Sequence, residues 1–216
     1  MNLFSGRTYS RLFVALLTAV TVGFWTGCED GGGHDYDFGS NDPNRVCCFG
    51  DSITGDVNYS GVNPYPSELA AMRPDKTVVN NGRGGESSSG GAGRVGRILK
   101  SKPGYLLILY GANDVINSTP HSRTISNLRS ILVNAKMNKT VPILATCLPM
   151  GKSRSIFNGS VQELNAQIRQ LANEEGVGLA DLESEFAGSF DLLPDGLHPN
   201  SAGNVIIAMA FADFIE

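Results

Sequence analysis

The feature that most constrains the fold of this chain is a regular alternation of short apolar runs with longer helical patterns. The apolar runs are continuous and do not alternate with polar residues, as is typical of strands buried on both faces of a parallel sheet. The five runs are Val46–Phe49, Thr77–Val79, Tyr105–Tyr110, Val141–Thr146 and Val177–Ala180. Strands that alternate with helices predict βαβ units. We therefore expect an α/β fold, a three-layer α/β/α sandwich with a parallel sheet of about five strands.

The segments between these runs have helical spacing. One helix is expected within residues 119–137, with Pro120 in its first turn. Its apolar face would consist of Ile125, Leu128, Leu132 and Ala135. A second helix is expected to open at the capping box Ser160–Glu163 and to end at Gly176. Its buried residues would be Val161, Leu164, Ile168 and Leu171, and a last helix is expected to start near Ser201.

Length and charge limit the number of domains and the kinds of partner. The chain has 216 residues, of which 41% are hydrophobic, which suits one domain with a full core. The formal net charge is -4 and the lysines and arginines are scattered along the sequence. Nucleic-acid binding needs a basic patch or stripe, so no nucleic-acid partner is expected.

The N-terminus has the layout of a secretory signal. Arg7 and Arg11 precede an uncharged apolar run, 12–25, which is short for a membrane span. Thr26, Gly27 and Cys28 follow, and this ending resembles that of a bacterial lipoprotein signal, except that Trp25 stands where an aliphatic residue is usual. The resemblance implies removal of residues 1–27 and lipidation of Cys28, which would anchor the protein in the bacterial cell envelope, on the periplasmic or surface side. Ordinary secretion and a retained membrane anchor remain alternatives.

Residues 28–44 are rich in Gly and Asp and lack apolar periodicity, so they are expected to form a flexible linker after the lipidated cysteine. The folded domain would then span residues 45–216. Three cysteines remain in it, Cys47, Cys48 and Cys147, without a Cys-x-x-Cys or Cys/His pattern. Buried free thiols are expected, with a disulfide as the alternative.

Four polar blocks follow one another along the chain. They are Gly50-Asp51-Ser52, the glycine-rich segment 80–86, Gly111-Ala112-Asn113-Asp114, and Asp195-Gly196-Leu197-His198. The first three follow apolar runs directly, and the fourth lies in the C-terminal loop region. Functional loops of parallel sheets gather at the carboxyl ends of the strands, so we expect the blocks to meet there.

The residue types in these blocks fit nucleophilic catalysis. A serine hydroxyl such as that of Ser52 is a weak nucleophile until a base takes its proton. His198 could be that base, and Asp195, three residues earlier, could fix its tautomer. Each block alone has a plainer interpretation, since these residues are common in turns and loop hydrogen bonds.

The two middle blocks could supply hydrogen-bond donors to an oxyanion. The glycines of the second block allow backbone amides to approach an anion closely. The block fits neither a dinucleotide fingerprint, because Ser87 stands at the third glycine position, nor a Walker A motif. The side-chain NH2 of Asn113 is a further donor, although Asn113-Asp114 could instead be a turn and a helix cap.

Together, in this order and spacing, the four blocks resemble those of the SGNH (GDSL-type) hydrolase family over roughly residues 45–214. The resemblance implies a flavodoxin-like fold, Ser52 as nucleophile, His198 as general base and then acid, and Asp195 as its orienting partner. It also implies an oxyanion hole made by the Ser52 amide, the Gly85 amide and the Asn113 side chain. Gly84 or Gly82 could replace Gly85 after a small shift in register. Ile53 and Ala112 depart from the family pattern without removing a reacting group, and no metal or other cofactor is implied.

An exported serine esterase that forms an acyl-serine intermediate is therefore expected. Short gaps between the blocks leave little chain for a lid, so an open groove and a short acyl group, such as acetyl on a carbohydrate or small ester, are favoured. The expected partner is a small-molecule or glycan ester, the membrane is contacted only through the anchor at Cys28, and the protein is expected to be a monomer. A lysophospholipase or thioesterase, and a non-catalytic envelope binding lipoprotein, are the alternatives. In the loop 148–159, Lys152 and Arg154 could contact an anionic substrate or be solvated, and Phe157 or Met150 could line an acyl pocket.

Overall fold

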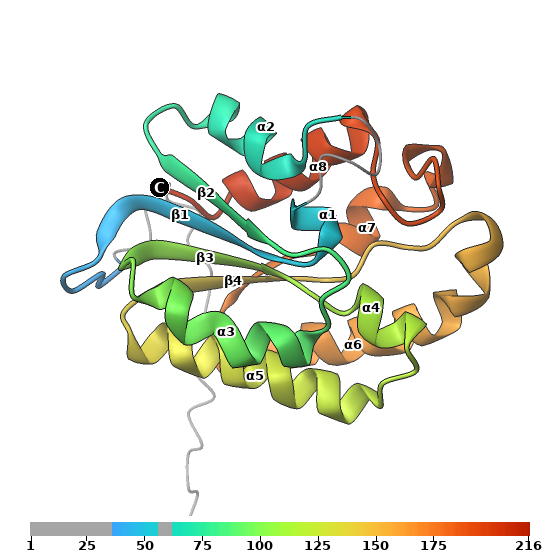
Figure 1. Ribbon diagram of the computed structural model, residues 1–216, viewed down its shortest axis with the longest axis horizontal. Coiled ribbons are helices and arrows are strands. Elements are labelled where there is room, and N and C mark those ends of the chain that lie inside the picture. The colour runs from blue at the N-terminus through green and yellow to red at the C-terminus, as the bar shows by residue number, and fades with distance from the viewer. Residues whose placement is uncertain (1–35, 56–61) are drawn as a thin grey trace, which may run out of the picture. The chain divides into compact units, whose positions relative to one another are not determined.

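Five parallel strands form one sheet in the computed structural model, and helices cover both faces of it (Figure 1). The structure describes residues 36–55 and 62–216. The predicted α/β sandwich is therefore confirmed. The expected signal peptide, Cys28 and the first part of the expected linker lie outside the described residues.

The sheet has the strand order β2-β1-β3-β4-β5. Its strands are β1 (Asp42–Gly50), β2 (Thr77–Gly82), β3 (Pro103–Leu109), β4 (Val141–Ala145) and β5 (Gly178–Ala180). Each of the five apolar runs therefore corresponds to one strand, and no run extends beyond its strand by more than one residue. β3 is buried along its whole length, whereas β2, at an edge of the sheet, is only partly buried. The chain runs from β1 outward to β2 and then returns to β3 on the other side of β1, so the strand order reverses between β1 and β3. Ligand sites in open parallel sheets lie at the carboxyl ends of the strands beside such a reversal.

Two groups of helices enclose the sheet (Figure 1). α2 (Tyr65–Met72) and α8 (Ser201–Ala212) lie on one face, and α3 (Ser88–Leu99), α5 (His121–Met137) and α6 (Asn158–Glu175) lie on the other. Three short helices follow strands directly: α1 (Ser52–Gly55) after β1, α4 (Ala112–Ile116) after β3, and α7 (Leu182–Phe186) after β5. Two short 3-10 helices, η1 (Lys152–Phe157) and η2 (Phe190–Leu192), lie in the later loops.

The buried faces of the long helices agree with their spacing. α5 buries Leu128, Leu132 and Ala135 as predicted, and Ile131 joins them, while Ile125 is only partly buried. All four apolar residues predicted for α6 are buried. Gly176, with a φ of +59°, ends that helix in the left-handed conformation.

The predicted capping box of α6 is wrong. The helix begins at Asn158, directly after η1, so Ser160 lies inside its first turn. The Asn158 side chain holds both backbone groups of Met150, its amide donating to the carbonyl and its oxygen accepting from the N–H, each at 2.7 Å. The Ser160 hydroxyl lies 2.8 Å from Nε2 of His121 and therefore joins α6 to the start of α5.

The chain is ordered and packed before the expected domain start at residue 45. β1 begins at Asp42, and the rings of Tyr36 and Phe38 pack edge-on against Tyr105, with centroid distances of 6.0 and 5.2 Å. The described part of the segment expected to be a linker therefore contributes aromatic packing. Tyr36 and Phe38 are the residues of this segment whose type could have indicated packing, because aromatic side chains are usually buried at least in part.

Cys47, Cys48 and Cys147 are buried free thiols, as expected. Burial raises the pKa of the Cys147 thiol well above its ordinary value, so it remains protonated and acts as a small apolar side chain. Within residues 36–55 and 62–216, no helix is both long and apolar enough to cross a membrane.

Candidate active site

The first block places a serine hydroxyl beside a histidine ring. Ser52 is the first residue of α1, immediately after the carboxyl end of β1. Its Oγ lies 2.9 Å from Nε2 of His198. Gly50 makes this turn possible, because a Cβ there would lie 2.5 Å from the Leu109 carbonyl oxygen and would collide with the Thr54 hydroxyl. Ser52 and His198 are only 7% and 6% exposed, so their hydrogen bond is largely shielded from water.

The fourth block completes a Ser-His-Asp arrangement. Nδ1 of His198 lies 2.7 Å from Oδ2 of Asp195. The other oxygen of Asp195 accepts the backbone N–H groups of Leu197 at 2.9 Å and His198 at 2.7 Å. Burial raises the pKa of the Asp195 carboxyl, but its hydrogen bonds with the side chain and backbone of His198 and with the Leu197 amide outweigh burial, and the pKa falls below its ordinary value. Asp195 is therefore a carboxylate at neutral pH and favours a proton on Nδ1, which leaves Nε2 to accept from Ser52.

Three consecutive carbonyls of the histidine loop are held by the segment around the start of η1. The Gly151 N–H donates to the Gly196 carbonyl at 2.9 Å, Arg154 Nη1 donates to the Asp195 carbonyl at 2.7 Å, and Lys152 Nζ donates to the Pro194 carbonyl. The sequence had suggested that the two cations are solvated or contact a substrate anion, and in the structure each donates to a backbone carbonyl of the histidine loop. The sequence carried no signal for this pairing because backbone carbonyls are acceptors at every position.

The second block forms a tight loop at the carboxyl end of β2. The Arg83 N–H donates to the Gly50 carbonyl at 3.0 Å, and the Glu86 N–H closes a turn onto the Arg83 carbonyl at 3.2 Å. Gly82 packs its backbone against Gly55, where a Cβ would collide with backbone atoms of α1, so this glycine serves close packing. Gly85 has a φ of +70° and open space around its Cα. Of these two glycines, Gly85 is the one with room for a ligand atom beside it.

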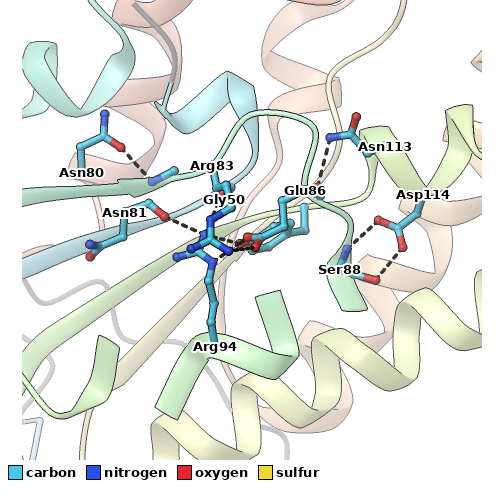
Figure 2. Close-up of polar contacts among 11 residues, drawn as sticks. Gly50, Asn80, Asn81, Arg83, Glu86, Ser88, Arg94, Asn113 and Asp114 are labelled. Atoms are coloured by element: carbon cyan, nitrogen blue, oxygen red, sulfur yellow. Dashed lines mark hydrogen bonds and ion pairs between the residues drawn. The ribbon is translucent and has the colours of Figure 1, made fainter. Parts of the chain in front are cut away.

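Asn113 lies within α4, whose N-cap is Gly111, so the alternative that it caps a helix is wrong. Its side-chain N–H groups already have acceptors: Oδ2 of Asp51 at 3.2 Å and the Glu86 carbonyl at 3.1 Å (the second is drawn in Figure 2). Asn113 thus links the first three blocks. Catalytic hydrogen bonds often form only when the substrate arrives, so an oxyanion would have to replace one of these acceptors.

Asp51 is a buried carboxyl whose importance the sequence did not reveal. Burial raises its pKa to about 7, and the nearby charge of Asp114 acts in the same direction. Hydrogen bonds from the Ile53 N–H and the Asn113 side chain act in the opposite direction.

Asp114, beside Asn113, ties the third block to the start of α3. Its two oxygens accept the Ser88 N–H at 2.8 Å and the Ser88 hydroxyl at 2.6 Å (Figure 2), and the Thr124 hydroxyl lies 3.3 Å away. Because these residues come from distant parts of the sequence, only the fold reveals the link. It holds the third block beside the start of α3, which begins two residues after the second block.

A cavity of about 560 Å³ lies at the amino ends of β4 and β5. Ser52 lies at the other end of the parallel strands, where their carboxyl ends are. Val141, Pro142 and Gly178 line the cavity, together with Lys136 and Lys139 from the end of α5. None of its lining residues belongs to the four blocks, so it is separate from the Ser52–His198 pair.

The chain is similar to known proteins in sequence and in fold. A family model described as "GDSL-like Lipase/Acylhydrolase family" matches residues 48–206, a range that contains all four blocks. A protein of Bacillus subtilis named "Uncharacterized lipoprotein YqeF" is 29% identical over 153 residues, which is 64% of this chain. The match spans 57% of the length of that relative.

Solved structures share the fold. The acetylxylan esterase Axe2 of Geobacillus stearothermophilus superposes with a TM-score of 0.70 at 22% identity, covering 81% of this chain and 95% of Axe2. A member of the lipolytic protein G-D-S-L family from Veillonella parvula gives a TM-score of 0.68 at 19% identity, covering 78% of this chain and 96% of its own.

Proposed function

Because this chain belongs to the GDSL-like lipase/acylhydrolase family, we propose that it is a serine esterase that cleaves carboxylic esters through an acyl-serine intermediate. The observation that carries the proposal is the continuous hydrogen-bonded path from the Ser52 hydroxyl through the His198 ring to the Asp195 carboxylate, with links of 2.9 and 2.7 Å. A nucleophile, a base and an orienting group within hydrogen-bonding reach are the arrangement that activates a serine.

The reaction proceeds in two steps. In the first, Nε2 of His198 takes the Ser52 proton as Oγ attacks the ester carbonyl, and the resulting imidazolium then protonates the departing alcohol. In the second, His198 removes a proton from water and the water oxygen attacks the acyl carbon. The bond between that carbon and Ser52 Oγ then breaks, the carboxylic acid leaves, and His198 returns the proton to Oγ. Asp195 stabilises the imidazolium in both steps because its carboxylate is ionised and hydrogen-bonded to Nδ1.

The negative charge on the carbonyl oxygen needs donors in the transition state. We assign this role to the amides of Ser52 and Gly85 and to the side chain of Asn113. The φ of +70° favours glycine at position 85, and nothing lies within 4 Å of where its Cβ would be, so an oxygen can approach the backbone there closely. Asn113 would exchange its 3.2 Å bond to Asp51, the longer of its two, for one to the oxyanion.

A short acyl group, acetyl on a carbohydrate or a small ester, is the substrate class we favour. The structural likeness to an acetylxylan esterase supports it, and so does Met150, which is fully buried and thus is not part of an open acyl pocket. Phe157, the other residue that could have lined an acyl pocket, is partly buried and packs against the hydrophobic core.

One observation favours the alternative, a lipid acyl hydrolase. Ile156 on η1 and Phe190 on η2 are 80% and 45% exposed. Both belong to the segments beside the histidine loop, since η1 is bonded to that loop and Phe190 packs against Gly151. Exposed apolar side chains near a reacting serine could contact a long acyl chain.

Hydrolysis of p-nitrophenyl esters from acetate to palmitate tests the function and separates these substrates. Activity that peaks at acetate and is unchanged in the double variant Ile156→Ser/Phe190→Ser would support the short-chain esterase. A peak at long chains that this variant abolishes would replace it with the lipid hydrolase. No turnover of any ester by the folded protein would favour a non-catalytic envelope binding protein.

We also propose that the protein is exported and lipid-anchored through Cys28. The named lipoprotein of Bacillus subtilis supports this proposal, as does the arrangement of Arg7, Arg11 and the apolar run before Cys28. Intact mass of the protein extracted from bacterial membranes would show loss of residues 1–27 and a diacylglyceryl group on Cys28. A Cys28→Ser variant that still fractionates with the membrane would contradict the anchor.

A further inference from the structure

Arg94 on α3 reaches the carboxyl ends of the three strands that carry the first three blocks. Its Nη2 lies 3.3 Å from the Gly50 carbonyl oxygen at the end of β1 and 2.8 Å from the Asn81 carbonyl oxygen in β2. The same nitrogen lies 2.7 Å from the hydroxyl of Tyr110, the residue directly after β3. The Arg94 side chain is only 13% exposed, and it points from its helix toward Glu86 and Gly50 (Figure 2). One guanidinium therefore fixes three strand ends relative to one another.

Glu86 connects this guanidinium to two of the three proposed oxyanion donors, the Gly85 amide and the Asn113 side chain. Its Oε2 accepts from Arg94 Nε at 2.7 Å and from the Tyr110 hydroxyl at 2.6 Å, and its side chain is only 7% exposed. Its backbone carbonyl accepts from Asn113 (Figure 2). Its N–H closes the turn that contains Gly85. A displacement of Glu86 would therefore move Gly85 and Asn113 together.

Two adjacent glycines of α3 make room for the network. A Cβ at Gly90 would lie 2.6 Å from Cγ of Glu86, and one at Gly91 would lie 2.7 Å from Cζ of Tyr110. Glycine lowers the stability of a helix relative to alanine, but at these two positions it allows the side chains of Glu86 and Tyr110 to approach α3 closely. The Arg94 guanidinium also stacks over Phe49 of β1, with Cζ 4.3 Å from the ring centroid.

We propose that Arg94 is a positioning residue that, through Glu86, sets the location of the oxyanion donors Gly85 and Asn113. The inference rests on the proposed esterase function. Arg94 is bonded to protein groups on several sides and acts on the reaction through Glu86. A lysine would keep the charge but lose the planar fork of donors that joins Glu86, Asn81 and Tyr110.

Kinetics of Arg94→Lys and Arg94→Ala on p-nitrophenyl acetate test this role. We expect kcat to fall roughly tenfold in the lysine variant and roughly a hundredfold in the alanine variant, with KM within about twofold, because misplaced donors weaken transition-state binding. Arg97→Ala is the matched control, since Arg97 is exposed on the same helix. It should retain wild-type kcat.

A boronic acid inhibitor separates positioning from general loss of structure. Its tetrahedral adduct with a catalytic serine places an oxygen where the oxyanion forms. In the Arg94 variants its inhibition constant should rise by the same factor as kcat falls, while the substrate KM stays constant. A variant that is simply less folded would have fewer active sites but an unchanged inhibition constant.

Removing one member of a buried ion pair can unfold a protein, so a second variant is needed. Arg94→Met/Glu86→Leu removes both charges and avoids an unpaired one. All assays are run roughly 20 °C or more below the melting temperature of each variant, so that each variant is folded during the assay. A folded double variant with reduced kcat and weakened boronate inhibition would support the proposal.

Wild-type kcat and boronate inhibition in folded Arg94→Ala, or in the folded double variant, would overturn the proposal. The Ser52→Ala variant keeps that result distinct from failure of the esterase function. If Ser52→Ala is inactive and Arg94→Ala is unaffected, only the positioning role fails. If Ser52→Ala retains full activity, the esterase mechanism itself fails.

Discussion

Asn113 donates its side-chain amide to the carboxyl group of Asp51 at 3.2 Å, so the third and first blocks are bonded to each other before any substrate is present. The two residues are 62 positions apart in the sequence and follow the adjacent strands β1 and β3. The Asp51 carboxyl, whose pKa burial raises to about 7, is therefore in direct contact with the proposed oxyanion donor Asn113.

Asp51 should give the stability of the protein a pH dependence that Asp51→Asn removes. Its pKa is raised from 3.8 to about 7 by burial, so between these values the folded state binds more protons than the unfolded state. The free energy of unfolding that Asp51 contributes then falls as pH rises from about 4 to about 7, and is constant above that range. The stability of Asp51→Asn relative to wild type should therefore increase over this interval, by roughly 4 kcal/mol. Urea unfolding at pH 4, 5.5, 7 and 8 measures it, and a pH-independent difference would contradict the burial effect.

Asn113→Ala should lower kcat about a hundredfold and change KM little, because a lost oxyanion donor weakens the transition state by roughly 3 kcal/mol. Steady-state hydrolysis of p-nitrophenyl acetate measures both constants. Asn117→Ala is the control, since Asn117 is exposed at the end of the same short helix. Equal kcat values for Asn113→Ala and Asn117→Ala would show that Asn113 does not stabilise the oxyanion.

Arg154→Ala should lower kcat by roughly tenfold for neutral and anionic esters alike, because its bond to the Asp195 carbonyl positions the histidine loop. Hydrolysis of a neutral acetate ester and of a succinate half-ester by the same preparation measures this. A rise in KM confined to the anionic ester would show instead that Arg154 binds substrate charge. Arg123→Ala, at an exposed position on α5, should match wild type.

Gly196→Ala should destabilise the loop of Asp195 and His198. Gly196 has a φ of +83°, and a Cβ there would collide with the Gly151 carbonyl oxygen. We expect a loss of roughly 1–3 kcal/mol in unfolding free energy, together with reduced activity. Gly93→Ala on α3 is the matched control, because its Cβ would meet nothing within 4 Å, and it should stabilise the protein by about 0.5–1 kcal/mol. Thermal unfolding compares the two, and equal melting temperatures would contradict the strain argument.

The sheet could be predicted from the sequence because each buried strand is a short apolar run bounded by turn residues. The position of Ser52 could be anticipated for a related reason: short polar blocks that end buried strands meet at the carboxyl ends of a parallel sheet. The partnership of Asp195 and His198 with Ser52 was anticipated from the resemblance to a known family, because their block follows η2 and no strand. Helix boundaries were less predictable. α6 begins before its expected capping box because Asn158 binds the backbone of Met150, a contact made through the fold.

The supporting contacts of the site could not be predicted from the sequence. Arg94, Glu86 and Tyr110 are single polar residues with no shared spacing, and only the packing of α3 against the strand ends joins them. Lys152 and Arg154 resemble ordinary loop cations, since their acceptors are backbone carbonyls of a loop about 40 residues away. Pairings of this kind depend on tertiary geometry, which periodicity and motif spacing do not encode.

Attack of the Ser52 hydroxyl on the ester can be followed by hydrolysis of p-nitrophenyl acetate by wild type and Ser52→Ala, with intact-mass analysis of both proteins after rapid acid quenching. We expect an acetyl adduct on the wild type alone, at Ser52, and a loss of about 10⁴-fold or more in kcat for Ser52→Ala. Equal turnover by the two proteins, or an acetyl adduct on folded Ser52→Ala, would contradict the mechanism.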